Sequence, residues 1–355
     1  MRITKVRQKM AEQNLDGLLV TDPSNRRYLS GFTGSAGELI VTAERAILVV
    51  DFRYFERAER ESPAWEQARV TAKHQDTVVE TVTGLDIARL GIESDHLTVA
   101  QWHELKQALP GVELVPLERF VLPLRAIKDQ EEIAALKKAI ACSDAAFAHL
   151  CQVIHPGMTE LQVAWELESH MRQHGASALA FPIIAGSGPN GAMPHATSSE
   201  RVIKEGEPIV MDFGAVVDGY CSDITRTLCL GQPDDRYLEI WNLVLEAQLA
   251  AEEQIRPGMT GQQADAIARD LFGRAGYGEQ FGHGLGHGVG LNVHEAPGVG
   301  RLSAESVLEP GMAFTVEPGL YLPGWGGVRI EDIVLMHENG VEVLTQAPKE
   351  PIWAG

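Results

Sequence analysis

The sequence predicts a small α/β domain followed by a larger α+β domain, and two observations support this. Between Asp16 and about Leu124, short apolar segments alternate with helical ones, which is typical of an α/β domain. After this region, a pattern of helix, Pro-Gly turn, helix and strands occurs twice. A length of 355 residues also suits two domains. We therefore expect domains at residues 1–124 and 125–355.

The elements of the first domain follow from apolar runs bounded by turn residues. An amphipathic helix is expected within residues 1–15, where apolar side chains alternate with charged ones. The turn cluster Asp22-Pro23-Ser24-Asn25 ends the first predicted strand. Residues 51–60 change to a helical pattern. Strands are predicted at residues 17–20, 39–41, 46–50 and 89–92.

The second domain contains a weak internal repeat. It opens with a predicted helix at residues 129–150, where Ile133, Leu136 and Ile140 follow the helical period. The segment IHPGMT at 154–159 recurs as IRPGMT at 255–260. Each copy precedes a predicted helix, at 160–174 and 262–275, with threonine as a suitable N-cap. Several matches in the same order indicate two related halves with a site between them.

Composition excludes several classes of function. The formal net charge is −19, whereas a nucleic-acid-binding protein normally carries a basic face. No apolar run reaches the roughly 18 residues of a membrane span, and the N-terminal segment lacks the apolar core of a signal peptide. Four cysteines without a C-x-x-C pattern do not form a disulfide scaffold. We expect a cytoplasmic protein that binds neither nucleic acid nor membrane.

Two pairs of carboxylates are the first candidate site. Asp212 and Asp223 flank the hairpin signal Asp218-Gly219, and Glu317 and Glu331 flank the glycine-rich segment 323–327. Each hairpin brings its two acids together. Four clustered carboxylates repel one another unless cations lie among them, so two divalent ions are expected. The alternative for a single pair is an ordinary solvated hairpin.

Histidines in glycine-rich segments extend this candidate site. The segment FGHGLGHGVG carries His283 and His287, and His294 follows soon after. Glycines permit close backbone approach, while the absence of Glu after His283 excludes the H-E-x-x-H zinc helix. His195 follows another glycine-rich loop, at 185–191, which lacks the lysine of a phosphate-binding loop. We expect one of these imidazoles to join the carboxylates as a ligand.

The second domain resembles the pita-bread metallopeptidases of the aminopeptidase P and prolidase branch, and the first resembles their creatinase-like N-terminal domain. The resemblance covers almost the whole second domain. Its motifs are PHA at 194–196, MDFG at 211–214, SDITRT at 222–227, HGLGHGVG at 283–290, VHE at 293–295, TVEPG at 315–319 and VRIED at 328–332.

The resemblance implies a dinuclear metal site and a homodimer. The implied metal ligands are Asp212, Asp223, His287, Glu317 and Glu331. Four oxygen donors and one imidazole suit Mn²⁺ or Co²⁺ without excluding Zn²⁺, and the resemblance favours Mn²⁺.

The resemblance also implies hydrolysis by a metal-bridging hydroxide. Glu317 is then the proton shuttle, and His294 stabilises the tetrahedral intermediate. His195 and His283 hold the substrate around the scissile bond, so that His195, His294 and Glu317 form the catalytic set. Arg329 is expected to contact a ligand carboxylate and to border the substrate.

Substrate selection is expected to centre on peptides with proline at position two. An Xaa-Pro bond lacks an N–H and has a fixed φ, so a site built around the ring can accept it. Segments 28–37 and 51–55 look more like aminopeptidase P than prolidase, and no arginine for a substrate carboxylate is evident. We therefore expect an Xaa-Pro aminopeptidase, with an Xaa-Pro dipeptidase as the alternative. A catalytically inactive binding protein on the same fold is a remote alternative, because all five ligands are present.

Overall fold

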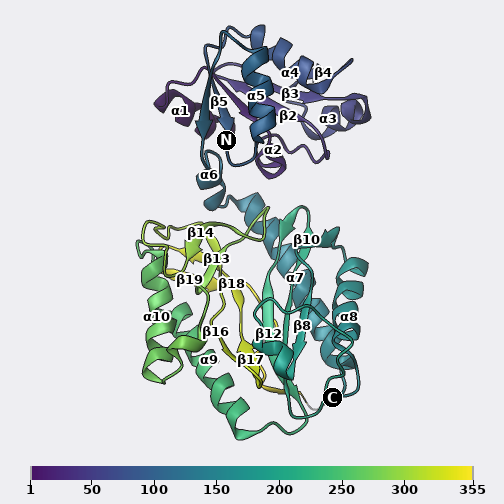
Figure 1. Ribbon diagram of the computed structural model, residues 1–355, viewed down its shortest axis with the longest axis vertical. Coiled ribbons are helices and arrows are strands. Elements are labelled where there is room, and N and C mark those ends of the chain that lie inside the picture. The colour runs from purple at the N-terminus through teal and green to yellow at the C-terminus, as the bar shows by residue number, and fades with distance from the viewer. Residues whose placement is uncertain (1, 354–355) are drawn as a thin grey trace. The chain divides into compact units, whose positions relative to one another are not determined.

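The computed structural model describes residues 2–353. It divides into two compact units between Arg125 and Ala126, which are drawn in Figure 1. The outermost residues of the two predicted domains, residues 1 and 354–355, lie outside the described part. Among residues 2–353, no helix has the length and apolar character required to cross a membrane.

The N-terminal unit is built on a six-stranded mixed sheet with the order β4-β3-β2-β1-β5-β6. β1 pairs in parallel with β5 and antiparallel with β2. The strands are β1 (Gly17–Val20), β2 (Glu38–Thr42), β3 (Ala46–Val50), β4 (Glu66–Arg69), β5 (Arg89–Glu93) and β6 (Glu113–Leu117). The alternating pattern did not reveal β4 or β6, because both are short and contain exposed polar residues.

Helices connect these strands and cover the sheet. Val78 and Val82 of α4 and Leu105 of α5 join a buried cluster with Leu19 and Ile40 of the sheet. The helices are α1 (Arg2–Glu12), α2 (Pro23–Ser30), η1 (Phe52–Tyr54), α3 (Phe55–Glu61), α4 (His74–Thr83), α5 (Val99–Ala108) and α6 (Leu122–Ala126). This arrangement confirms the predicted α/β class.

The second unit places two pairs of helices around a set of central strands. In Figure 1, α7 and α8 lie on one side of these strands, and α9 and α10 lie on the other. The helices are α7 (Gln130–Val153), α8 (Glu160–Gln173), η2 (Gly188–Ala192), α9 (Asp235–Gln254), α10 (Gly261–Arg274) and η3 (Gly278–Gln280).

Most strands of this unit belong to two main sheets, ordered β20-β12-β9-β8 and β14-β13-β15-β18-β19. The strands of the first half are β7 (Ala178–Leu179), β8 (Ile184–Ser187), β9 (Pro208–Phe213), β10 (Ala215–Val217), β11 (Tyr220–Cys221) and β12 (Ile224–Leu230). Those of the second half are β13 (Gly286–Gly288), β14 (Glu295–Val299), β15 (Ala313–Val316), β16 (Gly319–Leu322), β17 (Gly326–Arg329), β18 (Asp332–His337), β19 (Gly340–Val343) and β20 (Ile352–Trp353).

The internal repeat is visible in matching turns. Gly157 and Gly258 both adopt a positive φ, of 98° and 88°, as a turn after a helix requires. Their N–H groups donate to the carbonyls of Ile203 and Leu308, at 3.0 and 2.8 Å. The helix that follows each turn begins with a capping box built on threonine and glutamine. The second unit is therefore an α+β domain of two related halves, as the pita-bread expectation requires.

Candidate metal centre

The first pair of acids is brought together by antiparallel pairing of β9 with β12. Asp212 lies on β9 opposite Thr225, and Asp223 directly precedes β12. The intervening β10–β11 hairpin turns at Asp218-Gly219, where φ is 50° and 79°. These values match the left-handed turn that the Asp-Gly pair predicts.

The second pair is positioned in the same way. Glu317 directly follows β15, and Glu331 directly precedes β18. The pairing of β15 with β18 aligns Val316 with Asp332, so that the two glutamates extend from the same end of this strand pair. The β16–β17 hairpin joins them through the predicted glycine-rich turn.

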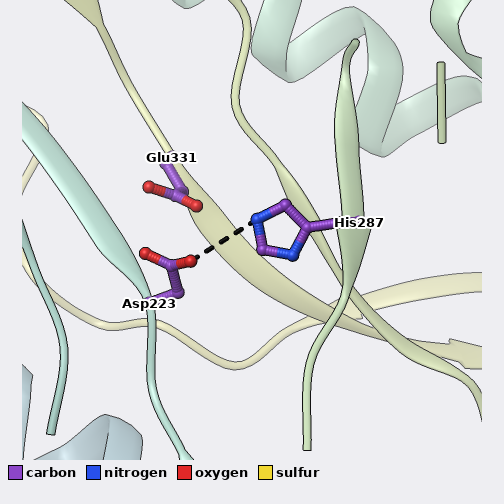
Figure 2. Close-up of side chains that lie close together, drawn as sticks. All are labelled: Asp223, His287 and Glu331. Carbon is purple, nitrogen blue, oxygen red and sulfur yellow. Dashed lines mark ion pairs between the residues drawn. The ribbon is translucent and has the colours of Figure 1, made fainter. Parts of the chain in front are cut away.

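His287 of β13 points into the group of acids. Its Nε2 lies 3.5 Å from Oδ2 of Asp223 and 3.3 Å from Oε1 of Glu317. Ligand atoms of Asp223, His287 and Glu331 all lie within 4.8 Å of one another, and Figure 2 shows these three side chains converging. Glycine is needed beside His287, because a Cβ on Gly286 would lie 2.0 Å from the carbonyl oxygen of Thr315.

The electrostatics of this group favour a bound cation. Burial raises the pKa of Asp223 well above its ordinary value, and the carboxylates of Glu331, Asp212 and Glu317 raise it further. Burial likewise raises the pKa of Glu331 well above its ordinary value. Oδ1 of Asp212 is buried without a hydrogen-bond partner. Unpaired buried oxygens are costly, so the residues present fit divalent metal ions with oxygen and imidazole ligands.

Neighbouring polar side chains fix the orientation of these carboxylates. The hydroxyl of Thr225 donates to Oε2 of Glu331 at 2.6 Å, and that of Thr315 donates to Oε1 of Glu317 at 3.0 Å. The Nη2 of Arg329 donates to Oδ2 of Asp212. The two threonines were not anticipated from the sequence as site residues, although each lies two positions from a predicted ligand.

A cavity of about 480 Å³ opens over the carboxylates, within the range of about 300–1,000 Å³ that holds small ligands. His195 and His294 line it with exposed side chains. The ring of His294 lies 4.0 Å from that of His287, centroid to centroid. Both histidines can therefore contact a ligand in the cavity. Phe181 and Pro182 add an apolar wall.

His283 and Arg329 also line the cavity, but both are held by Tyr321. Arg329 Nη1 donates to the Tyr321 hydroxyl at 2.6 Å, and His283 Nε2 lies 3.0 Å from the same oxygen. Nε of Arg329 donates to Thr225 at 2.8 Å. Arg329 thus contacts Asp212, a candidate metal ligand, as expected. Its other two guanidinium nitrogens donate to Tyr321 and Thr225. Tyr321 was missed, because a single tyrosine on an apolar strand gives no sequence signal.

Known proteins resemble this chain over both units. Residues 134–338 match metallopeptidase family M24, and residues 2–127 match the creatinase/prolidase N-terminal domain. A solved structure described as an Xaa-Pro dipeptidase from Bacillus anthracis is 46% identical, with a TM-score of 0.96 over 99% of this chain and 98% of that chain.

Two further relatives differ in the activity that their names give. A structure described as an X-Pro aminopeptidase from Thermotoga maritima is 36% identical, with a TM-score of 0.93 and complete coverage of both chains. A protein from Pyrococcus horikoshii named Xaa-Pro dipeptidase is 38% identical over 99% of this chain and 98% of its own length. The converging carboxylates fit a metal-dependent enzyme, and the full-length matches are to peptidases. The chain belongs to metallopeptidase family M24.

Proposed function

We propose that this metal-dependent peptidase hydrolyses Xaa-Pro dipeptides. The convergence of Asp223, His287 and Glu331 within 4.8 Å carries the hydrolytic part of the proposal. The choice of dipeptides follows the relatives from Bacillus anthracis and Pyrococcus horikoshii, whose names give that activity. These names favour the dipeptidase alternative over the aminopeptidase that the first-domain motifs suggested.

The proposed ligands of two divalent cations are Asp212, Asp223, His287, Glu317 and Glu331. When bound, the cations would lower the pKa of a water molecule and polarise the scissile carbonyl. With the cations bound, the four carboxylates would be ionised and balance their charge. The Nδ1 of His287 lies 3.1 Å from the carbonyl oxygen of Gly288. The Nε2 of His287 is thereby directed toward the acids.

The other site residues have separate proposed roles. Glu317, held by Thr315, takes a proton at the carboxylate and transfers it to the leaving nitrogen. His294, exposed in the cavity, stabilises the tetrahedral intermediate, and His195, also exposed there, holds the substrate beside the scissile bond together with His283. His283 and Arg329 border the substrate and, through Tyr321, maintain the shape of this wall.

Selectivity for proline is supported by the apolar part of the cavity. Phe181, Pro182 and Ile184 form a wall without charged groups. A pyrrolidine ring has no N–H to satisfy and a restricted φ, so such a wall can pack against it without leaving a polar group unpaired. Peptides with proline at position two are therefore the proposed substrates.

An Xaa-Pro aminopeptidase is the second candidate. Among the described residues that line the cavity, Arg329 is the only arginine or lysine, and its guanidinium already contacts Asp212, Thr225 and Tyr321. A dipeptidase is expected to bind the C-terminal carboxylate of its substrate. The engagement of this cation therefore favours longer peptides, as does the name of the Thermotoga maritima relative.

Three further expectations are proposals about the protein in the cell. The four oxygen donors and one imidazole favour Mn²⁺ over metals selected by thiolates. A cytoplasmic location is proposed as well, with which the acidic composition agrees. A homodimer is proposed from the resemblance to the prolidase branch. Metal analysis, cell fractionation and analytical ultracentrifugation test these three proposals in turn.

The decisive experiment compares Leu-Pro, Leu-Pro-Gly and Leu-Gly as substrates of protein reloaded with Mn²⁺, with free amino acids separated by chromatography. We expect rapid release of leucine from Leu-Pro, little from Leu-Pro-Gly and none from Leu-Gly. Faster cleavage of Leu-Pro-Gly would select the aminopeptidase, and cleavage of Leu-Gly would remove the proline requirement.

A matched pair of variants tests the site itself. Glu317→Gln is expected to lower kcat by about a hundredfold or more, since general acid–base groups contribute about that much. Glu309→Gln makes the same chemical change at an exposed position and is expected to retain full activity. Equal activities of the two variants would contradict the role of Glu317.

A further inference from the structure

The N-terminal unit contains a second cavity, which the proposed reaction does not use. Its volume is about 510 Å³, which again falls within the range of about 300–1,000 Å³ typical of small-ligand sites. All of its lining residues lie between Leu19 and Leu105, so the cavity belongs to this unit alone. Leu19, Val78 and Leu105 form its apolar wall.

This cavity lies where open α/β sheets commonly bind ligands. β1 and β5 are parallel neighbours, but the chain leaves β1 toward β2 and leaves β5 toward β6, on the opposite side. Ligands bind at the carboxyl ends of strands at such a change of direction. Thr21 follows β1 and His96 follows β5, and the Thr21 hydroxyl lies 3.0 Å from the His96 Nδ1.

The loop at this end of the sheet is already fixed. The buried carboxylate of Glu93 accepts hydrogen bonds from the backbone N–H groups of Thr21 and Asp22, each at 2.7 Å. It also accepts one from the side chain of Asn25 at 2.7 Å. A cavity with ordered walls loses little conformational entropy on binding, which favours affinity for a small ligand.

One wall of the cavity presents the carboxylate of Glu38. The side chain of Glu38 is 26% exposed and contacts the Nε2 of His74. Burial raises the pKa of Glu38 to about 7 and lowers that of His74, so this contact is not a strong ion pair at neutral pH. The charge of Arg26 lowers the pKa of Glu38, but its guanidinium donates hydrogen bonds to the carbonyls of Gly34 and Gly37.

The rim of the cavity presents the opposite charge. Arg53 is 56% exposed and is held by the carboxylate of Asp51, at 2.7 Å between Nη2 and Oδ2. Both residues line the cavity together with Glu38. The carboxylate of Glu38, the guanidinium of Arg53 at the rim and an apolar surface therefore lie around one space.

We propose that this cavity binds a small zwitterion, namely an α-amino acid with an apolar side chain. Its ammonium group contacts Glu38, and its carboxylate contacts Arg53. Its side chain packs against Leu19, Val78 and Leu105. This assignment uses only the chemistry of the N-terminal unit and does not depend on which peptides the second unit hydrolyses.

Hydrogen exchange of the full-length, metal-loaded protein with L-leucine tests the site, because it separates this cavity from the metal centre. We expect leucine to slow exchange in residues 21–26, 35–38, 51–53, 74–78 and 94–97. Isocaproate lacks the ammonium group and isoamylamine lacks the carboxylate. Both are expected to bind at least about tenfold more weakly, since each loses a charged hydrogen bond.

Variants distinguish recognition from a general effect on the fold. Glu38→Gln and the rim variant Arg53→Met are each expected to weaken leucine binding at least about tenfold in calorimetry. Glu44→Gln, in the exposed turn between β2 and β3, is expected to bind leucine like the wild type. Absence of protection in these segments would overturn the proposal, as would wild-type affinity in both Glu38→Gln and Arg53→Met.

Discussion

Replacing Asp332 with asparagine is expected to destabilise the second unit strongly. Asp332 has a fully buried side chain and contacts Arg226 Nη2 at 2.7 Å, while the Arg226 side chain is 3% exposed. Its other oxygen contacts Lys349 Nζ at 2.5 Å and Gln248 Nε2 at 3.1 Å. Asparagine removes the negative charge and turns an N–H₂ group toward one of these donors.

The expected cost follows from the burial of the remaining charge. Removing one partner of a buried ion pair costs about 3–5 kcal/mol, because the other charge stays desolvated. For a unit of this size each kcal/mol lowers Tm by about 2–4 °C, so Asp332→Asn is expected to lower Tm by roughly 6–20 °C. Arg226 also donates to the carbonyl of Glu331 at 2.6 Å, so metal affinity is expected to fall as well.

Scanning calorimetry of the metal-loaded protein measures this effect. Asp218→Asn is the matched control, because Asp218 pairs with Lys138 at the surface, where the two side chains are 57% and 65% exposed. Such pairs contribute about 0–1 kcal/mol. The double variant Arg226→Met with Asp332→Leu is expected to recover only part of the lost stability, because Lys349 and Gln248 still lose their contact with Asp332. A shift of Tm for Asp332→Asn no larger than that for Asp218→Asn would refute the reasoning.

Three further outcomes are expected. Thr225→Val removes the hydroxyl that orients Glu331 and is expected to weaken metal binding by about 10–100-fold in metal titrations; unchanged affinity would contradict this role. Burial raises the pKa of Glu252 from 4.5 to about 7, so its stabilising contribution is complete below pH 4.5. As pH rises to 7, the wild type is expected to lose up to about 3 kcal/mol more unfolding free energy than Glu252→Gln; equal pH dependence of the two unfolding free energies, measured with urea, would contradict this. Because burial raises the pKa of Asp223 and Glu331, metal binding to the metal-free protein is expected to release on the order of one to two protons. Released protons are taken up by the buffer, so a binding enthalpy that is the same in buffers of different ionisation enthalpy would exclude this.

Sequence reasoning located the acids of the site because their signals are local. Asp218-Gly219 predicts the turn that aligns Asp212 with Thr225 across β9 and β12, and acids at the ends of apolar strands require partners. The role of His287 as the imidazole among the acids came from the resemblance, since spacing alone did not distinguish it from His283.

The supporting residues were not accessible from sequence. Tyr321 contacts His283, which lies 38 positions away, and Arg226 contacts Asp332 across 106 positions. Such contacts depend on how segments far apart in the sequence pack against one another, which no local pattern encodes. The strands β4 and β6 were missed for a related reason, since exposed polar residues interrupt their alternation.

The two related halves make unequal contributions to the cavity. Each half contributes two acids to one site, as the two subunits of a symmetric dimer each contribute groups to a ligand at their interface. β8 flanks β9 as β13 flanks β15, yet Ile184 and Pro182 face the cavity from the first half where the second presents His287. The two related halves therefore differ at this flank: one presents a proposed metal ligand and the other an apolar surface.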